Sequence, residues 1–509
     1  MKKNGSGMPA SDGVITVFFA LLTPLFLALL FIMVESVRFQ GARAQTVQIT
    51  DMAAFSAFGE FERELLEQYG IFAVDGSYGS GDFSVGRMND RIMHYLELNA
   101  YPDSSGLKAL CFDPWQVIPQ VSQIKSYGLL SDRNAGPFYQ QAVAYMRKTA
   151  VTASVGKLLE YYQDAQHADS QKEAYQKKNT DTGKELDNVD RAMQEAREEA
   201  AENDMEGQQN ASSVSNPIGA LKRLRRKKLM KIVCPQGGIS KNKVSSGELC
   251  SKRWGGRSGN WDWNFPYGGL TDNLLFREYL LSHFPHYGSE DEGKALHYQI
   301  EYIIAGKTSD EANLKKTVKE LLALREACNY LCCVKSSHMS SQAELLATLL
   351  IGWTGIYELV AALKHVLLLG WSYAESLMDV RTLLEGGRVP LVKTEENWVI
   401  GLEELSSVNE LIAKGGRGSS EGYLYEDFLR ILLNLQSVSL QQKRGLDMLE
   451  MNMRSLGFSR FRADACIVCM KNEVKWTIRP LFGRVSGAFL GLSSGQEAML
   501  TKGGFSYVE

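Results

Sequence analysis

The sequence is poor in cysteine and in net charge, and each shortage argues against a class of protein. Eight cysteines in 509 residues are too few for a fold built on disulfides. Cys234 and Cys250 flank a glycine-rich loop and are the best candidates for a single bridge. The formal net charge of -3 lacks the basic excess that phosphate binding needs, which argues against nucleic acid as the main partner. Hydrophobic residues at 44% and charged residues at 23% indicate a folded globular chain.

Sequence motifs that carry catalysis or hold cofactors are also lacking. No HExxH metal motif and no GxSxG nucleophile elbow occurs. The segment at 305–308, AGKT, resembles the end of a phosphate-binding loop, but Glu301 stands where that motif needs glycine, so Gly306 is better explained as a helix end. Cys466 and Cys469 form a C-x-x-C inside a predicted strand. We therefore predict a protein that is not an enzyme, with no catalytic residue, metal, cofactor or small-molecule substrate.

One long apolar run is present, at residues 14–34. It begins at Val14, ends at Val34 and carries no charge. At about 1.5 Å per residue, a helix of this length spans about 30 Å, the thickness of a bilayer's hydrocarbon core. Pro24 is tolerated in a membrane helix. Two lysines precede the run, so the positive-inside rule predicts a cytoplasmic N-terminus, a single membrane pass and an extracytoplasmic body.

The apolar run has three alternative interpretations, of which we favour an uncleaved anchor. A signal peptide cut after Ala44 fits poorly, because the run is long and the cut lies well beyond it. In the third interpretation, the leader MKKNGSGMPASDG resembles that of type IV prepilins, with Gly13 and Val14 as the candidate processing site. Phe18 stands at the fifth mature position, where pilins usually carry glutamate.

A helical pattern continues beyond the apolar run, over residues 35–69. Apolar residues recur at spacings of three and four from Ile49 to Leu65, with charged residues between them. Gly70 is expected to end this helix, at about Gln68. The apolar stripe would pack on the exported body as a stalk or, alternatively, against sister subunits in a pilin-like shaft.

The chain as a whole predicts an α+β, helix-dominated fold. In it an N-terminal transmembrane helix continues into a stalk, and a large extracytoplasmic body has a minor β component. Strands are predicted at 117–124 and at 474–478, the latter paired with a strand at 462–470. The expected divisions are a cytoplasmic leader at 1–13, the transmembrane helix at 14–34, the stalk helix at 35–69, a mixed α/β segment at 70–135, a protruding helical region with a basic end at 136–233, a Gly- and Trp-rich loop at 234–269, a helical core domain at 270–460 and a C-terminal β segment at 461–509.

Residues 221–231, LKRLRRKKLMK, carry seven basic side chains in eleven positions. One interpretation is contact with an anionic lipid or cell-wall polymer. The alternative, which we favour, is a basic patch whose charges pair with those of the acidic stretch at 185–206. The candidate contacts to a polyanion are Lys222, Arg223, Arg225, Arg226, Lys227 and Lys228.

The second half of the chain is predominantly helical by its apolar spacing. Thr308 and Glu311 resemble a capping box at the start of one helix. On a later helix, Glu375, Asp379 and Arg381 would form either a buried polar network or surface ion pairs, and the sequence leaves both open.

Three blocks in this half, at 298–325, 370–398 and 425–453, carry a family resemblance. They read YQIEYIIAGKTSDEANLKKTVKELLALR, GWSYAESLMDVRTLLEGGRVPLVKTEENW and YEDFLRILLNLQSVSLQQKRGLDMLEMNM. Together with the N-terminal G-x-I-T-V pattern, they resemble an uncharacterised domain family of exported Gram-positive bacterial proteins encoded beside Tad/Flp-type pilus components. The anchor is similar to those of TadE/TadG-like pseudopilins. The resemblance implies a location and a context, and no activity.

These observations lead to two hypotheses of function. The first is a non-enzymatic, membrane-anchored structural component of a Tad/Flp-like pilus or secretion apparatus on the cell surface. Its partners would be other pilus subunits or further copies of itself, bound through the anchor and stalk helix. The second is a cell-surface binding module for a wall polymer or host ligand, motivated by the basic run and the tryptophan-rich loop. Both hypotheses place the protein in the cell membrane.

Overall fold

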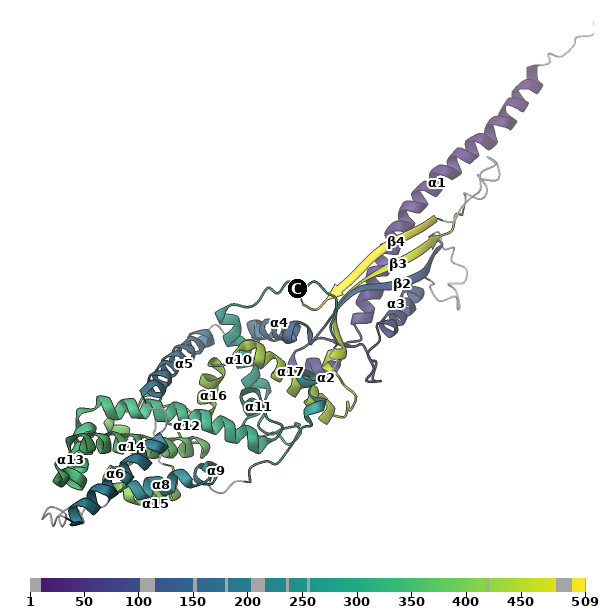
Figure 1. Ribbon diagram of the computed structural model, residues 1–509. Coiled ribbons are helices and arrows are strands. Elements are labelled where there is room, and N and C mark those ends of the chain that lie inside the picture. Colours follow the sequence, from purple (N-terminus) through teal and green to yellow (C-terminus); the bar gives the residue numbers. More distant parts are fainter. Residues whose placement is uncertain are drawn as a thin grey trace, which may run out of the picture. The chain divides into compact units, whose positions relative to one another are not determined.

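The computed structural model describes residues 11–100, 115–149, 153–178, 182–202, 216–234, 238–253, 257–416, 418, 421–481 and 497–508. They belong to two compact units. The sheet unit comprises Met1–Arg133, Arg257–Phe265 and Arg460–Glu509, and the helical unit comprises Asn134–Gly256 and Pro266–Ser459. Helices dominate and one small antiparallel sheet is present, which confirms the predicted fold class (Figure 1).

The sheet unit is built on a four-stranded antiparallel sheet with β3 at its centre. Its strands are β1 (Val74–Asp75), β2 (Val117–Leu129), β3 (Cys466–Ile478) and β4 (Glu497–Ser506), and β3 pairs with each of the other three. Along β3, Val474, Trp476 and Ile478 are buried whereas Lys475 is exposed, which confirms the predicted alternation.

The predicted partner strand at 462–470 is wrong, because its later residues belong to β3 itself. Lys471, Asn472 and Glu473 provide no glycine or proline where a hairpin turn would be needed, so the chain continues as one strand. The strand predicted at 117–124 is present as the first part of β2, which pairs with β3.

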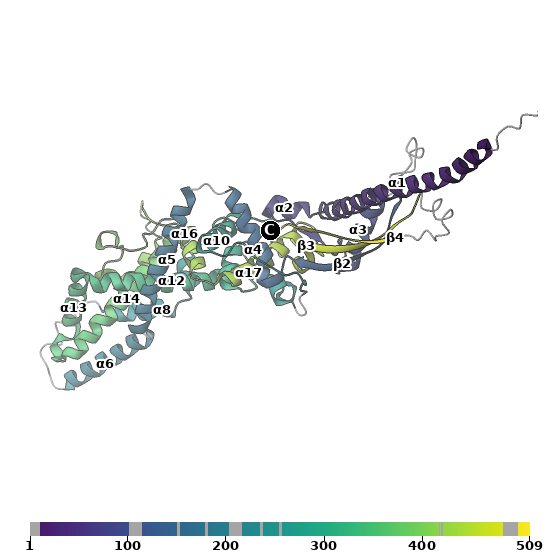
Figure 2. The same ribbon diagram turned by 90° about the horizontal axis from the view of Figure 1, so that it is seen from above.

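Two helices lie side by side against this sheet, α1 (Ser11–Phe58) and α3 (Val85–Ala100) (Figures 1 and 2). The second half of α1 contributes Ile49, Ala53 and Phe58 to a core that also contains Trp476. The first turns of α1 extend past the strands. Half of this helix is therefore fixed in the folded unit by apolar burial, and half is not.

The end of the stalk differs from the prediction. α1 stops at Phe58, earlier than expected, and a separate helix, α2 (Arg63–Tyr69), follows. Between them the backbone N–H of Glu62 donates to the carbonyl oxygen of Ala73 at 2.9 Å, a tertiary bond that a continuous helix would forgo. Gly70 ends α2 in the left-handed conformation, with φ 63°, as predicted.

The helical unit is centred on two long helices that pack on each other, α12 and α14, with α13 packed on α14 (Figure 2). Its α-helices are α4 (Asp132–Thr149), whose first residues lie in the sheet unit, α5 (Ala153–Lys178), α6 (Thr182–Glu202), α8 (Ile218–Arg226), α9 (Leu229–Val233), α10 (Leu270–His283), α11 (Gln299–Ala305), α12 (Asp310–Lys335), α13 (Ser337–Ile351), α14 (Tyr357–Leu384), α15 (Val408–Ala413), α16 (Tyr425–Asn434) and α17 (Val438–Ser455). Two short 3-10 helices, η5 (Glu395–Asn397) and η6 (Glu403–Ser407), lie between α14 and α15.

The region at 136–233 was expected to protrude, but its described residues pack within the helical unit. α5 lies against α12 with Ala165 and Ala168 buried, and α6 lies against α14 with Met193 buried. The polar residues that suggested a solvated hairpin occupy the outer faces of these helices, while small side chains allow close packing on the inner faces.

The start of α12 also differs from the prediction. Ser309, and not Thr308, is its N-cap residue, with its Oγ accepting from the backbone N–H of Ala312 at 3.4 Å. The carbonyl of Thr308 instead accepts from the N–H of Val244 at 2.9 Å, which holds residue 308 outside the helix.

The predicted bridge between Cys234 and Cys250 is wrong, because no disulfide joins them. The Cys234 Sγ lies 3.3 Å from the hydroxyl of Tyr287. Cys466 and Cys469 are buried in β3, and the Cys466 thiol donates to the carbonyl oxygen of Arg462 at 3.4 Å.

Candidate functional site

The first half of α1 is the candidate membrane anchor. Among the described residues, α1 is the single helix long and apolar enough to cross a bilayer. Phe18 and Val34 are exposed, and Pro24 lies inside the helix without ending it. Gly13 and Val14 lie in its first turn. Length and composition support a span, whereas the cytoplasmic N-terminus stays a prediction.

A buried ion pair lies where the apolar run ends. Glu35 and Arg38 face each other at 2.7 Å, and both side chains are at most 10% exposed. The Arg38 guanidinium also donates to the carbonyl oxygens of Trp115, at 2.8 Å, and Arg479, at 2.6 Å. The Glu35 carboxylate accepts from the N–H of Leu481 at 3.2 Å. Charge-assisted hydrogen bonds thus join the C-terminal end of the apolar segment to the residues just before β2 and just after β3.

The basic run divides into two groups of side chains. Lys222 pairs with Asp187 at 2.9 Å and with Asp190 at 2.6 Å, and its hydrogen bond lowers the pKa of Asp187. Arg225 lies 3.3 Å from Glu326 and stacks over the ring of Tyr373. The Lys222 contacts reach the acidic stretch at 185–206, whereas Arg225 pairs with α12 outside that stretch.

The second group of basic side chains is exposed and surrounds a cavity of about 380 Å³, the basic pocket. Its lining residues are Leu224, Lys227, Lys228, Lys231, Ile232, Arg381, Asn409, Ile412 and Ala413. Lys227 Nζ donates to Asn409 Oδ1 at 2.8 Å. Arg223 and Arg226 are exposed on α8 but do not line the basic pocket. The lining therefore combines four cations with no carboxylate.

A buried polar network lies between α12 and α14. Arg325 Nη2 lies 2.8 Å from Asp379, and Lys393 Nζ lies 2.6 Å from the other oxygen of Asp379. Lys393 also pairs with Glu375, and all four side chains are at most 3% exposed. Burial raises the pKa of Glu375. Burial would also raise the pKa of Asp379, but Arg325 and Lys393 outweigh it and hold that pKa below its ordinary value.

The network settles a question that the sequence left open. Glu375 and Asp379 are buried partners, whereas Arg381 pairs with Glu385 at 2.9 Å one helical turn away. The two cations of the network, on α12 and after α14, were missed because no spacing along the chain places them opposite these carboxylates.

The network holds the segment at 389–401 against the two helices. Glu375 accepts from the backbone N–H groups of Val399 and Ile400, each at 2.9 Å. Arg325 Nη1 donates to the carbonyl oxygens of Pro390 and Leu391, at 3.0 and 2.6 Å. The charged atoms are thus engaged with each other and with backbone, which suits a positioning role.

A groove of about 1010 Å³ lies over this segment, and we name it the acidic groove. Its apolar residues are Pro217, Met339, Leu345, Leu346, Leu349, Trp371, Trp398, Ile400 and Leu402, and its polar ones are His338, Gln342, Glu395, Glu396, Glu403 and Glu404, with Gly401. Glu395 accepts from the Ser336 hydroxyl, and Glu404 accepts from the N–H of Gly401. The lining residues come from α13, α14, η5, η6, the segment between η5 and η6, and the residue before α8. Because these segments are separated along the chain, no motif predicts the groove.

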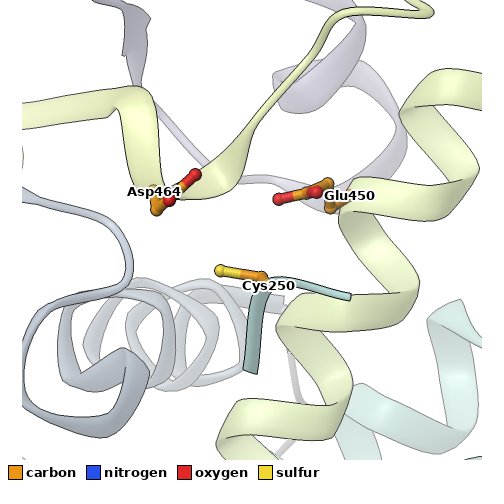
Figure 3. A group of neighbouring side chains, drawn as sticks. All are labelled: Cys250, Glu450 and Asp464. Carbon is orange, nitrogen blue, oxygen red and sulfur yellow. The ribbon is translucent and has the colours of Figure 1, made fainter. Parts of the chain in front are cut away.

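Figure 3 shows Cys250, Glu450 and Asp464, with Glu450 on α17. Cys250 and Glu450 belong to the helical unit, where Arg454 pairs with Glu450 at 2.7 Å. Asp464 belongs to the sheet unit, where Arg462 pairs with it at 3.1 Å. Each carboxylate has an arginine partner within its own unit, and we assign no metal site to these side chains.

One family model matches the chain, over residues 207–478, and its description is a family of unknown function. No curated protein and no solved structure matches. The basic pocket, the polar network and the acidic groove all lie within the matched segment, whereas α1 lies outside it.

Proposed function

The chain belongs to this family of unknown function, DUF5702, and from that premise we propose that it is a non-enzymatic, membrane-anchored structural component of a Tad/Flp-like pilus or secretion apparatus on the cell surface. The family contributes no activity, so the proposal draws on the physical character of the two units.

The single observation that carries the proposal is the divided character of α1. Its first half exposes Phe18, Leu25 and Leu29, which is costly in water and favourable in lipid. Its second half is part of the core of the sheet unit. An apolar anchor and a folded unit therefore share one helix, as a subunit held at a membrane surface requires.

The outer side of the packed half of α1 supports contact with other subunits. Val37, Val47, Met52 and Phe55 are exposed there, Met52 to 52% and Phe55 to 66%. They stay exposed although this half of the helix packs on the sheet, and the ring of Phe55 also meets Phe505 of β4 edge to face, with 5.8 Å between the ring centroids. Exposed apolar stripes of this kind mark contact surfaces, so we propose that other pilus subunits or further copies of this chain pack on it.

Co-purification from native membranes of the producing cells tests the proposal, with an affinity tag after Glu509. We expect Tad-type or pilin-like subunits to be retained with the full chain, and protease added to whole cells to digest the helical unit. Retention of this chain alone, or protection of the helical unit until the cells are opened, would contradict the proposal.

A second candidate function, binding of a phosphate-bearing wall polymer, is favoured by the basic pocket alone. Lys227→Glu combined with Lys228→Glu should abolish retention on immobilised wall polymer. The matched control is Lys315→Glu with Lys319→Glu, which reverses two exposed charges on α12. Equal retention of both double variants would rule this function out.

A further inference from the structure

The lining of the acidic groove combines exposed apolar side chains with carboxylates. Leu345 and Leu349 of α13 line it and are 63% and 51% exposed. The carboxylates are those of Glu395, Glu396, Glu403 and Glu404, and Glu395 lies 3.4 Å from His338, which also lines the groove. Within the described part of the chain, the carboxylates of Glu396 and Glu403 have no ion-pair or hydrogen-bond partner. Exposed apolar side chains beside unpaired carboxylates are expected where a complementary surface binds.

Hydrogen bonds and a ring contact hold the lining of the groove at Trp371, Trp398 and Ile400. Trp371 Nε1 donates to the carbonyl oxygen of Ile400 at 2.6 Å, and Glu375 holds the N–H of the same residue at 2.9 Å. The rings of Trp371 and Trp398 meet edge to face at 5.7 Å. The four charged side chains of the buried network thus fix the position of this part of the lining. A surface that is already ordered loses less conformational entropy when a partner binds.

We infer that the acidic groove binds an amphipathic α-helix of a partner protein, one that carries lysine or arginine on both sides of its apolar face. A helix with its side chains is about 10–12 Å wide, so a volume of about 1010 Å³ accommodates roughly two turns. Apolar anchors at helical spacing would contact Leu345 and Leu349, and flanking cations would pair with the carboxylates of the lining. The four carboxylates select against acidic partners and anionic lipid.

The basic helix of this chain, α8, is not the occupant. Its apolar residues Leu221 and Leu224 are buried within its own unit, and Lys222 is already paired with Asp187 and Asp190. The inference concerns a helix of another protein and does not depend on the membrane role of α1.

Photo-crosslinking to the full chain tests the inference, with the protein held in nanodiscs of zwitterionic lipid. The probe is a designed leucine/lysine amphipathic peptide of about 14 residues, roughly four turns, with one photoreactive side chain. Two control peptides replace every lysine by glutamate or every leucine by serine. We expect adducts on α13 and residues 395–404 with the leucine/lysine peptide, and at most about a tenth of that yield with either control.

Variants of the groove locate the contact. Glu396→Lys with Glu403→Lys should lower adduct yield about tenfold, and Leu349→Asp should do the same, while Glu292→Lys with Glu311→Lys, exposed carboxylates outside the groove, should leave it unchanged. All these positions are exposed, and circular dichroism confirms folding. Equal labelling by the glutamate peptide, or adducts that survive both groove variants, would overturn the inference.

Discussion

At the scale of single residues, Lys393 is the cation shared by two buried carboxylates. Lys393→Met keeps the length of the side chain but removes the partner of Glu375 and one of the two partners of Asp379. Breaking a buried pair in this way leaves an uncompensated charge. We expect the free energy of unfolding to fall by about 3–5 kcal/mol, measured by denaturant unfolding followed by circular dichroism.

Lys335→Met on α12 is the matched control for this change, because Lys335 is exposed. Its effect should stay within about 0.5 kcal/mol. The double variant Lys393→Met with Glu375→Gln should recover part of the loss, since it removes the orphaned charge. If Lys393→Met were as mild as the control, the network would not position the segment at 389–401.

Glu301 is fully buried on α11, and this burial raises its pKa to about 7 from an ordinary 4.5. Tyr287 N–H and Tyr425 Oη donate to one of its oxygens, at 2.9 and 3.0 Å. Below pH 4.5 the carboxyl is protonated in both the folded and the unfolded chain, so it contributes no pH dependence. Between pH 4.5 and 7 only the unfolded chain ionises, so stability falls as the pH rises.

Glu301→Gln should therefore unfold like the parent protein near pH 4 and be more stable at pH 8, by about 3 kcal/mol. Thermal unfolding across this pH range measures the difference. Glu311→Gln, an exposed position on α12, serves as the control and should show no such trend. A constant gap between Glu301→Gln and the parent at every pH would contradict the assigned pKa direction.

The residue scale also shows what the sequence could reveal about the site. Glu375 and Asp379 were recognisable because carboxylates one turn apart on an apolar helix need an explanation. Their cations were not, because Arg325 lies on another helix and Lys393 follows a glycine-containing loop. Arg381 was also predicted as a possible member of the network, because it lies close to Asp379 along the helix. Its side chain instead pairs with Glu385, one turn further along. Side-chain partners across elements depend on tertiary packing that spacing does not encode.

At the scale of elements, the outer stripe of α1 gives a prediction about association. A photoreactive amino acid at Val47, which is 41% exposed, should crosslink to a neighbouring subunit in native membranes. Met52→Ser with Phe55→Ser should lose that adduct, because the exposed apolar contact is removed. This variant also loses the ring contact between Phe55 and Phe505, so circular dichroism checks that it folds. The same photoreactive residue at Glu97, exposed on α3, is the control and should give no adduct. Adducts at Val47 that persist in the double variant would count against a contact along this stripe.

Elements were easier to predict than their limits. The periodicity of apolar residues was enough for α12, α13 and α14, because each buries a long stripe. It failed at Phe58, where the pattern continues but a tertiary bond to Ala73 ends the helix. It also failed at residues 462–470, where two apparent strands are one, and at Thr308, which pairs with the loop at 243–244. Each failure involves a backbone partner distant in sequence.

At the scale of the whole molecule, the apolar helix α1 and the two cavities belong to different units. α1 lies in the sheet unit, whereas the acidic groove and the basic pocket lie in the helical unit. The fold class was predictable from composition and period, but this division was not. The sheet unit gathers three separate stretches of chain, and the pairing of β2 with β3 joins residues more than three hundred positions apart. The segment predicted at 70–135, as far as Arg133, and the segment at 461–509 therefore belong to one unit.

This division predicts that membrane attachment depends on the first half of α1 alone. Leu25→Lys with Leu29→Lys places two charges in the apolar run, and each costs about 2.5–3.5 kcal/mol near the centre of a bilayer helix. We expect the variant to leave the membrane fraction and become extractable with carbonate. Met52→Lys with Phe55→Lys adds the same charges to exposed positions of the packed half and should stay in the membrane. Both pairs of residues are exposed on the folded protein, and the proposal places only Leu25 and Leu29 in lipid. Release of both variants from the membrane, or of neither, would therefore show that the apolar half of α1 does not act as a separate anchor.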